Sequence, residues 1–353
     1  MRMPYKLTFS GMNALVFACF LLPSAAHAQL APSPGAPPPA SNAKPEVDES
    51  EPIETLKVRV NLVSLYFTAR DHHGALIPDL KKDNCNVVED KKPQTLKNFI
   101  AQPDQPLTLG ILLDTSGSQR NVLGIEQQAG AQFLQRVLSA KDEAFLISFD
   151  INSNLLTDYT NNARVIRTAM DKAEINTGSG GYGGAIPQSN PKGTVLYDAV
   201  YLASHDKLQT ETGRKAMILL TDGEDQGSDV TLNGAIEAAQ KADTIVYVLL
   251  CADRGFYGGG IGIGYTGDSA MRKLAEATGG RVITVGNNEK KLQDAFAQIE
   301  AELRTQYVAS YTPTNSALDG SYRKIEIQCK QNPSDESLLK VQARKGYYAI
   351  PRD

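Results

Sequence analysis

From residue 104 to residue 305, short apolar runs alternate with longer amphipathic segments, and no other feature limits the possible folds so strongly. Several runs are apolar almost throughout, as in strands that are covered on both faces. Helical crossovers between successive strands produce a parallel sheet, so the pattern predicts a doubly wound, Rossmann-like α/β domain. The expected strands are 107–113, 144–149, 216–221, 244–250 and 281–285, and the expected helices are 119–138, 161–174, 195–208, 229–241, 269–278 and 288–305.

One segment of this domain, 154–159, follows the strand before it too closely for a helical crossover, so we expect an antiparallel edge strand there. The regions on either side of the domain have strand character without helices. The expected strands are 58–71, 86–90 and 95–100, broken by the turn-forming segments HHGALIPD and DKKPQ, and then 306–313, 321–329 and 338–348. Neither set has enough strands to stand alone. We therefore predict that residues 53–103 and 306–353 form one immunoglobulin-like β sandwich into which the α/β domain is inserted.

The first 28 residues have the features of a secretory signal peptide. Two basic residues precede the apolar run 14–22, and an A-x-A cleavage site ends at Ala28. The apolar run is much shorter than the roughly 20 residues of a membrane span. Residues 29–52 are rich in Pro and Ala and are expected to form a disordered linker. We expect a secreted or periplasmic protein that has no integral membrane segment after cleavage.

The composition excludes several classes of protein. With 41% hydrophobic and 22% charged residues, the chain is an ordinary globular one. Its formal net charge is −4 and it has no basic patch, so nucleic acid is not an expected partner. Cys85, Cys251 and Cys329 remain after removal of the signal peptide, too few and too scattered for a disulfide framework or a zinc site. A bridge between Cys85 and Cys329 is a hypothesis that follows from placing both in one sandwich, because sequence alone does not fix the pairing.

Oxygen-bearing side chains gather where two of the predicted strands end. DTSGS, residues 114–118, follows strand 107–113, and TDGED, residues 221–225, begins at the end of strand 216–221. Ligands of doubly wound sheets bind in the crevice at the carboxyl ends of the strands. Both clusters are therefore expected on the same rim. Taken singly, DTSGS is as typical of a turn or a helix cap as of a binding site, and TDGED is more typical of a turn.

A third element, Thr194, follows a Gly-rich loop and is expected to open a helix beside that rim. On its own this residue is typical of a helix N-cap. Together the candidate residues supply only oxygen atoms, from two carboxylates and three hydroxyls. Mg²⁺ and Mn²⁺ prefer oxygen ligands, and Mg²⁺ usually keeps some of its positions for water or for the oxygen of a partner. The predicted metal site consists of Asp114, Ser116, Ser118, Thr194 and Asp222.

These motifs resemble those of von Willebrand factor type A domains. DTSGS is similar to the D-x-S-x-S loop of that family, TVLYDA to its threonine motif and TDG to its third motif, which together form a metal-ion-dependent adhesion site. The resemblance covers roughly residues 104–305. It implies that the three hydroxyls bind the ion directly or nearly so, while Asp114 and Asp222 act mainly through bound water. The stretches 76–99 and 322–349 also resemble the flanks of a group of exported bacterial proteins, many from acidobacteria, that carry such a domain.

The expected function is that of an exported, non-enzymatic binding module. In this interpretation, an acidic side chain of a protein partner completes the coordination shell of Mg²⁺ or Mn²⁺. Specificity would come from two Gly-rich loops, 178–192 and 252–268, whose aromatic residues are typical interface anchors, although they are equally consistent with loops that fold back on the domain. These aromatic residues are Tyr182, Phe256, Tyr257 and Tyr265.

Two alternatives are a metal-dependent envelope hydrolase and a structural assembly protein whose ion only stabilises the fold. The hydrolase is disfavoured because no G-x-S-x-G elbow occurs and no histidine is expected near Ser116 to act as a general base. The glycines of 258–267 do not follow the G-x-G-x-x-G spacing of a dinucleotide site. Glu224 and Asp225 are interpreted as a solvated turn, with a place on the metal rim as the alternative.

Overall fold

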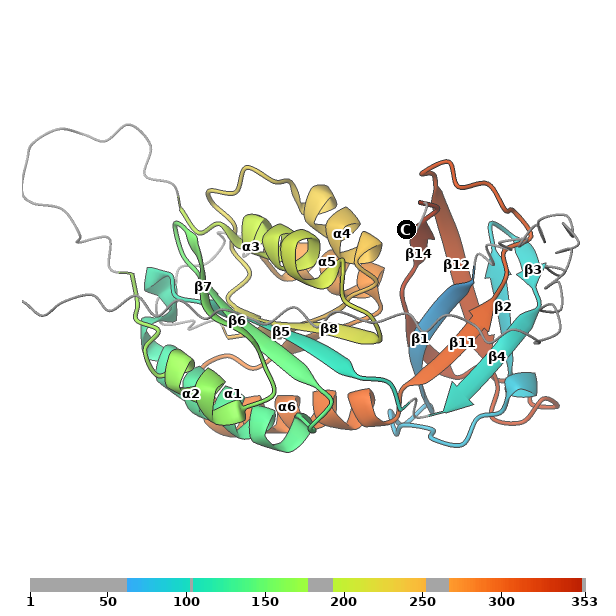
Figure 1. Cartoon of the computed structure of the whole chain (residues 1–353). Helices are drawn as coiled ribbons and strands as arrows, with labels where there is room; N and C mark the ends of the chain where they lie inside the picture. Colours follow the sequence, from blue (N-terminus) through green and yellow to red (C-terminus); the bar gives the residue numbers. More distant parts are fainter. Residues whose placement is uncertain (1–61, 102–103, 177–192, 252–266, 351–353) are drawn as a thin grey trace, which may run out of the picture. The chain divides into compact units, whose positions relative to one another are not determined.

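Six strands form one mostly parallel sheet in the order β10-β9-β8-β5-β6-β7 (Figure 1). The computed structural model describes residues 62–101, 104–176, 193–251 and 267–350. Every neighbouring pair is parallel except β6 and β7, which are antiparallel. The strands are β5 (Leu107–Asp114), β6 (Glu143–Phe149), β7 (Ser153–Thr160), β8 (Arg214–Thr221), β9 (Ile245–Leu250) and β10 (Val282–Thr284). The predicted doubly wound fold is confirmed, and so is the antiparallel edge strand.

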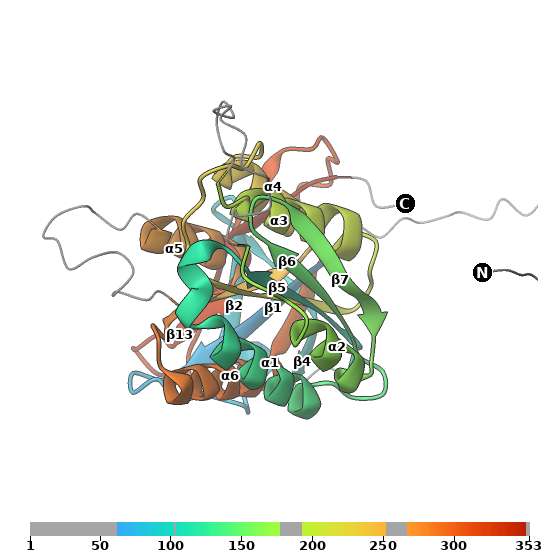
Figure 2. The ribbon, with the colours of Figure 1, turned by 90° about the vertical axis from the view of Figure 1, so that its left-hand side faces the viewer.

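Helices cover both faces of this sheet (Figures 1 and 2). Alternate residues of β5 show why its sequence is apolar throughout. Leu109 and Ile111 belong to the core beneath one set of helices, whereas Leu112 belongs to the core beneath the other. The first set is α1 (Leu123–Val137), α2 (Ala163–Met170) and α6 (Glu289–Arg304), and the second is α3 (Leu196–Leu202), α4 (Leu232–Lys241) and α5 (Gly267–Thr278). A π-helical stretch, Ala203–Leu208, continues α3.

The remaining strands form two antiparallel four-stranded sheets, β13-β1-β11-β4 and β14-β12-β2-β3. Strands from before and after the α/β domain alternate in the first sheet, where β11 pairs with β1 on one side and β4 on the other. In the second sheet they meet where β12 pairs with β2. Both sheets share one hydrophobic core, so they form a β sandwich. The strands are β1 (Val63–Arg70), β2 (Cys85–Glu89), β3 (Lys92–Gln94), β4 (Leu96–Ala101), β11 (Tyr307–Tyr311), β12 (Tyr322–Cys329), β13 (Lys340–Ala343) and β14 (Gly346–Tyr348).

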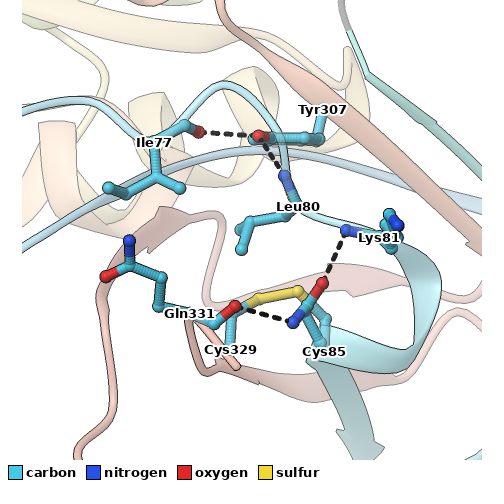
Figure 3. The surroundings of a disulfide bond; sticks show 8 residues. Ile77, Leu80, Lys81, Cys85, Tyr307, Cys329 and Gln331 are labelled. Atoms are coloured by element: carbon cyan, nitrogen blue, oxygen red, sulfur yellow. Dashed lines mark hydrogen bonds between the residues drawn. A yellow bond between two sulfur atoms is a disulfide. The ribbon is translucent and has the colours of Figure 1, made fainter. Parts of the chain in front are cut away.

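A disulfide bond joins Cys85 and Cys329, the pair hypothesised from the sequence. The two residues face each other across β2 and β12 and lie in the core of the sandwich. Beside the bond, the Tyr307 hydroxyl donates to the Ile77 carbonyl (2.6 Å) and accepts from the Leu80 amide (3.0 Å), as Figure 3 shows. These bonds hold the segment that connects β1 to β2 against the sandwich.

The structure differs from the sequence prediction at several element boundaries. A 3₁₀ turn, Gly117–Asn121, precedes α1, because the chain turns tightly after Asp114 before the helix begins at Leu123. Only Asp90 and Lys91 of DKKPQ form the expected turn, both with positive φ, and β3 follows at once in a two-residue hairpin. The expected strand 338–348 is two strands in different sheets, because the chain crosses between the sheets after Ala343.

Other predictions fall partly or wholly outside the described residues. The signal peptide, the linker and residues 58–61 of the first expected strand lie there, as do Tyr182, Phe256, Tyr257 and Tyr265. Within the described part of the chain, no helix has the length and apolar character needed to cross a membrane.

Candidate metal centre

The first motif folds into a tight arrangement of oxygen atoms at the end of β5. Asp114 is the last residue of β5 and is fully buried. Its Oδ1 accepts a hydrogen bond from the Ser116 amide (2.9 Å), and the hydroxyls of Ser116 and Ser118 lie 3.0 Å apart and bond to each other. Although Ser116 is the N-cap of the 3₁₀ turn, its side chain makes no capping bond. The cap alternative for this serine is therefore wrong.

The third motif meets the first across two adjacent strands. β8 lies directly beside β5, with Leu220 opposite Leu113, so Asp222 follows β8 at the level where β5 ends in Asp114. The hydroxyl of Thr221 donates to Asp114 Oδ2 at 2.6 Å. The strand order reverses between β5 and β8, because β6 lies on the far side of β5 and β9 on the far side of β8. This is the switch point at which doubly wound sheets bind ligands.

Thr194 reaches the same rim through its backbone. Its carbonyl accepts hydrogen bonds from the amides of Gln226 (3.0 Å) and Gly227 (3.1 Å), in the loop that follows Asp222. Helix α3 begins two residues later, at Leu196, and its N-cap is Val195. Thr194 is therefore not the N-cap of this helix, and its hydroxyl is not committed to that role.

The two acids of the rim are buried and close enough to repel each other. Burial first and the charge of Asp222 second raise the pKa of Asp114 to about 7, although hydrogen bonds from Ser116 and Thr221 oppose the shift. Asp222 is 2% exposed. Two carboxylates in one water-poor region need a proton or a cation between them. The electrostatics of the rim therefore fit a bound cation.

The side chains available at the rim limit which metal ion could bind there. Among the described residues, no group of three or more His, Cys, Asp or Glu side chains could hold a metal. A site at this rim must therefore use hydroxyl and water oxygens besides its two acids, and such a set suits Mg²⁺ or Mn²⁺ better than zinc. The five predicted residues fit that requirement, since three of them contribute hydroxyls.

Glu224 and Asp225, which are not among the five predicted metal-site residues, have structural roles. Asp225 accepts bonds from the Tyr197 amide (3.2 Å) and the Ser228 hydroxyl (2.5 Å), which fixes the loop after β8 against the start of α3. Glu224 Oε1 accepts from the Gly267 amide at 3.2 Å and so ties the same loop to the start of α5. These bonds agree with the predicted turn. The turn is bonded to the starts of α3 and α5 and is not simply exposed to solvent.

Sequence reasoning missed Thr221 and a buried polar group behind the rim. Glu126 on α1 and Gln119 before it are fully buried, and the polar side-chain atoms of both lack hydrogen-bond partners within the described residues. A signal for Glu126 was available. It lies three residues after Leu123 and seven before Phe133, on the helix face that is otherwise apolar.

The histidines of the described residues belong to other parts of the fold. The His205 ring stacks on Tyr201 with centroids 5.2 Å apart, and its Nδ1 pairs with Asp206 at 2.7 Å. This imidazole is thus engaged on its own helix. His72 and His73 lie in the turn after β1 of the sandwich.

No protein-family model matches the chain, and no curated protein matches it significantly. Solved structures do resemble it. The conserved hypothetical protein BatB from Bacteroides thetaiotaomicron is 18% identical, with 56% of this chain and 98% of that chain covered and a TM-score of 0.41. The von Willebrand factor domain of the pili tip protein Mfa5 from Porphyromonas gingivalis is 12% identical, with 56% and 94% covered and a TM-score of 0.41. Proximal thread matrix protein 1 from the mussel byssus, with a zinc-occupied MIDAS motif, is 15% identical, with 61% and 50% covered and a TM-score of 0.45.

Proposed function

We propose that this protein is an exported, non-enzymatic binding module that holds one divalent cation, Mg²⁺ or Mn²⁺, at the rim between β5 and β8. The hydroxyls of Ser116, Ser118 and Thr194 bind the ion, and Asp114 and Asp222 hold it mainly through water. An acidic side chain of a protein partner completes the coordination shell. The observation that carries this proposal is the pair of serine hydroxyls, bonded to each other, beside two buried carboxyls at the switch point.

Neutral hydroxyls give the site its adhesive character. They leave the ion with much of its positive charge, so the ion still attracts an anionic group from outside. An ion enclosed by several carboxylates would lose that attraction. The sequence resemblance to von Willebrand factor type A domains supports the same interpretation, since all five motif positions are present.

Cation titration tests the metal centre. We expect Mg²⁺ and Mn²⁺ to raise the free energy of unfolding of the wild type, by about 2.7 kcal/mol at a cation concentration one hundred times Kd. Asp114→Ala should abolish this gain. Asp319→Ala, which removes an exposed carboxylate of the sandwich, should retain it. Calorimetric titration and denaturant unfolding with and without EDTA provide the measurements.

The adhesive role needs a separate test. Peptides selected from a random library in Mg²⁺ should contain Asp or Glu, and they should lose binding when that residue becomes Asn or Gln or when EDTA is added. Capture that survives chelation would show the adhesion mechanism to be wrong. Cation stabilisation without any carboxylate-dependent peptide would instead identify a structural ion, and metal-dependent turnover of an ester or phosphoester would identify a hydrolase.

A further inference from the structure

A third carboxyl group lies behind the metal centre. Glu126, in the first turn of α1, is 0% exposed, and neither carboxylate oxygen has a hydrogen-bond partner within the described residues. Successive backbone bonds fix its place relative to the first motif. The Gln119 amide donates to the Ser116 carbonyl (3.0 Å), the Val122 amide to the Gln119 carbonyl (3.0 Å) and the Glu126 amide to the Val122 carbonyl (3.1 Å). These bonds tie the first turn of α1 to the loop that carries the serines.

Contacts of Cys251 also connect Glu126 to the rim. The amide of Cys251, just after β9, donates to the Thr221 carbonyl at 2.8 Å, and the Thr221 hydroxyl donates to Asp114 at 2.6 Å. Burial raises the pKa of Glu126, and the fully buried Cys251 thiol beside the carboxyl offsets a part of that rise. Backbone and side-chain bonds thus connect Cys251 to Thr221 and Asp114 at the rim, and the Cys251 thiol lies beside Glu126.

The three acids interact through space. Burial raises the pKa of Glu126 to about 8, and the charges of Asp114 and Asp222 contribute to that shift. A buried carboxyl without a partner destabilises the fold, and an apolar residue of similar size would avoid the cost. Its position beside two further acids makes it useful only when a cation is present. Then each negative charge in this water-poor region attracts the ion.

We propose that Glu126 is a positioning residue of the metal centre, whose negative charge strengthens divalent cation binding from behind Asp114 and Asp222 without contacting the ion. This inference rests on the proposed function. Action through space agrees with the described residues, in which no three acidic, histidine or cysteine side chains are placed to share a metal. Residues behind metal ligands commonly change metal affinity by ten- to a hundredfold when they are substituted.

The test compares variants of the full chain by calorimetric titration with Mg²⁺ and Mn²⁺ at pH 8. Glu126→Gln keeps the size of the side chain and removes the charge, so we expect about tenfold weaker binding. Glu126→Asp keeps the charge at a shifted position and should restore part of the affinity. The matched control is Glu89→Gln, which removes a 2% exposed carboxylate that accepts bonds from Tyr311 and Tyr347 in the sandwich. It should bind cations like the wild type.

Unfolding curves in EDTA separate a structural role from the proposed one. Without cation, Glu126→Gln should be at least as stable as the wild type, because the substitution removes a buried charge. Mg²⁺ should nevertheless raise the free energy of unfolding of this variant by less than it raises that of the wild type. Altered stability with unchanged cation affinity would overturn the inference. If Glu126→Gln does not fold, Glu126→Asp decides instead, and wild-type affinity in that variant would overturn it. A wild type that binds no cation, or an Asp114→Ala variant that binds normally, would instead refute the proposed function itself.

Discussion

Asp114 and Asp222 lie at the ends of two adjacent strands, where the fold brings negative charge together and removes water. Hydrogen bonds from Ser116 and Thr221 offset the burial of Asp114 only in part, since its pKa stays above the ordinary range. The Glu126 carboxyl adds to the same region. Without a cation, the folded chain relieves this repulsion by holding protons that the unfolded chain releases.

This proton uptake makes stability depend on pH in a defined direction. The pKa values of Asp114 and Glu126 are raised on folding, to about 7 and about 8, so between roughly pH 4 and pH 8 the native state binds more protons than the unfolded state. The free energy of unfolding in EDTA should therefore fall as pH rises, by about 5 kcal/mol from pH 5.5 to pH 8 when both groups titrate. Denaturant unfolding at the two pH values measures the change.

A variant and a ligand provide the controls for this pH dependence. Asp114→Asn combined with Glu126→Gln removes both titrating groups and should flatten the decline. Mg²⁺ at pH 8 should raise the stability of the wild type, because a cation takes the place of the protons. An equally steep decline in the double variant would assign the effect to other groups.

How far the site can be predicted differs from residue to residue. Asp114 and Asp222 could be located because an apolar run marks where each strand ends, and parallel strands end on one edge. Thr194 could be located because a helix was predicted to begin beside the rim, although α3 begins two residues later, at Leu196. Glu126 could not be assigned in the same way. A single acid on an apolar helix face is usually a solvated side chain near the boundary, and only tertiary packing closes the core over it.

Among the elements, β2 and β12 matter most for the sandwich, because the disulfide bond joins them across 244 residues of sequence. In the chain-entropy account, a bond that closes a long loop limits the unfolded chain strongly. The bond also fixes the pairing between one strand that precedes the α/β domain and one that follows it.

Removal of the disulfide tests this role. Cys85→Ser combined with Cys329→Ser should lower the free energy of unfolding by about 2–4 kcal/mol. The wild type in reductant should approach the variant, while the variant should not respond to reductant. Thermal unfolding with and without reductant measures both effects. Non-reducing peptide mapping that finds free thiols at both positions would contradict the bond itself.

Long, strongly patterned elements were predictable and short sandwich strands were less so. The helices around the parallel sheet appear where amphipathic segments indicated them. The strands β3, β13 and β14 have only three or four residues, too few for a periodic pattern. Their positions depend on pairing with distant partners. Arg344 lies where the chain crosses from β13 to β14, and its guanidinium bonds to Asp243 and to the Ser64 carbonyl. Both partners are distant in sequence, so the local sequence pattern does not predict these bonds.

In the molecule as a whole, the fully buried carboxylate of Glu302 on α6 links the parallel sheet domain to the sandwich. It accepts bonds from Arg70 of β1 (2.6 Å), from Arg281 before β10 (2.7 Å) and from Gln342 of β13 (3.3 Å). Both arginines are less than one third exposed, at 21% and 27%. One side chain thus neutralises two partly buried cations and connects elements from both parts of the fold.

Substitution of this carboxylate should destabilise the molecule. Glu302→Gln leaves both arginines without a counter-charge, and we expect a loss of about 2–3 kcal/mol in the free energy of unfolding. The matched control, Glu300→Gln, lies on the same helix in exposed pairs with Arg136 and Arg304 and should cost about 0.5 kcal/mol or less. Equal losses in the two variants, measured by denaturant unfolding, would refute the special role of Glu302.

The pairing of β4 with β11 also has a mechanical meaning. The α/β domain leaves the sandwich after Ala101 and returns at Tyr307, and these two residues are partners in the sheet. Tension that the polypeptide carries from the α/β domain therefore enters the sandwich at the same end of two neighbouring strands. The force acts on β4 and β11 in the same direction, so it does not separate the hydrogen bonds between them. The bonds between β11 and β1, distributed along β11, then resist the load in shear.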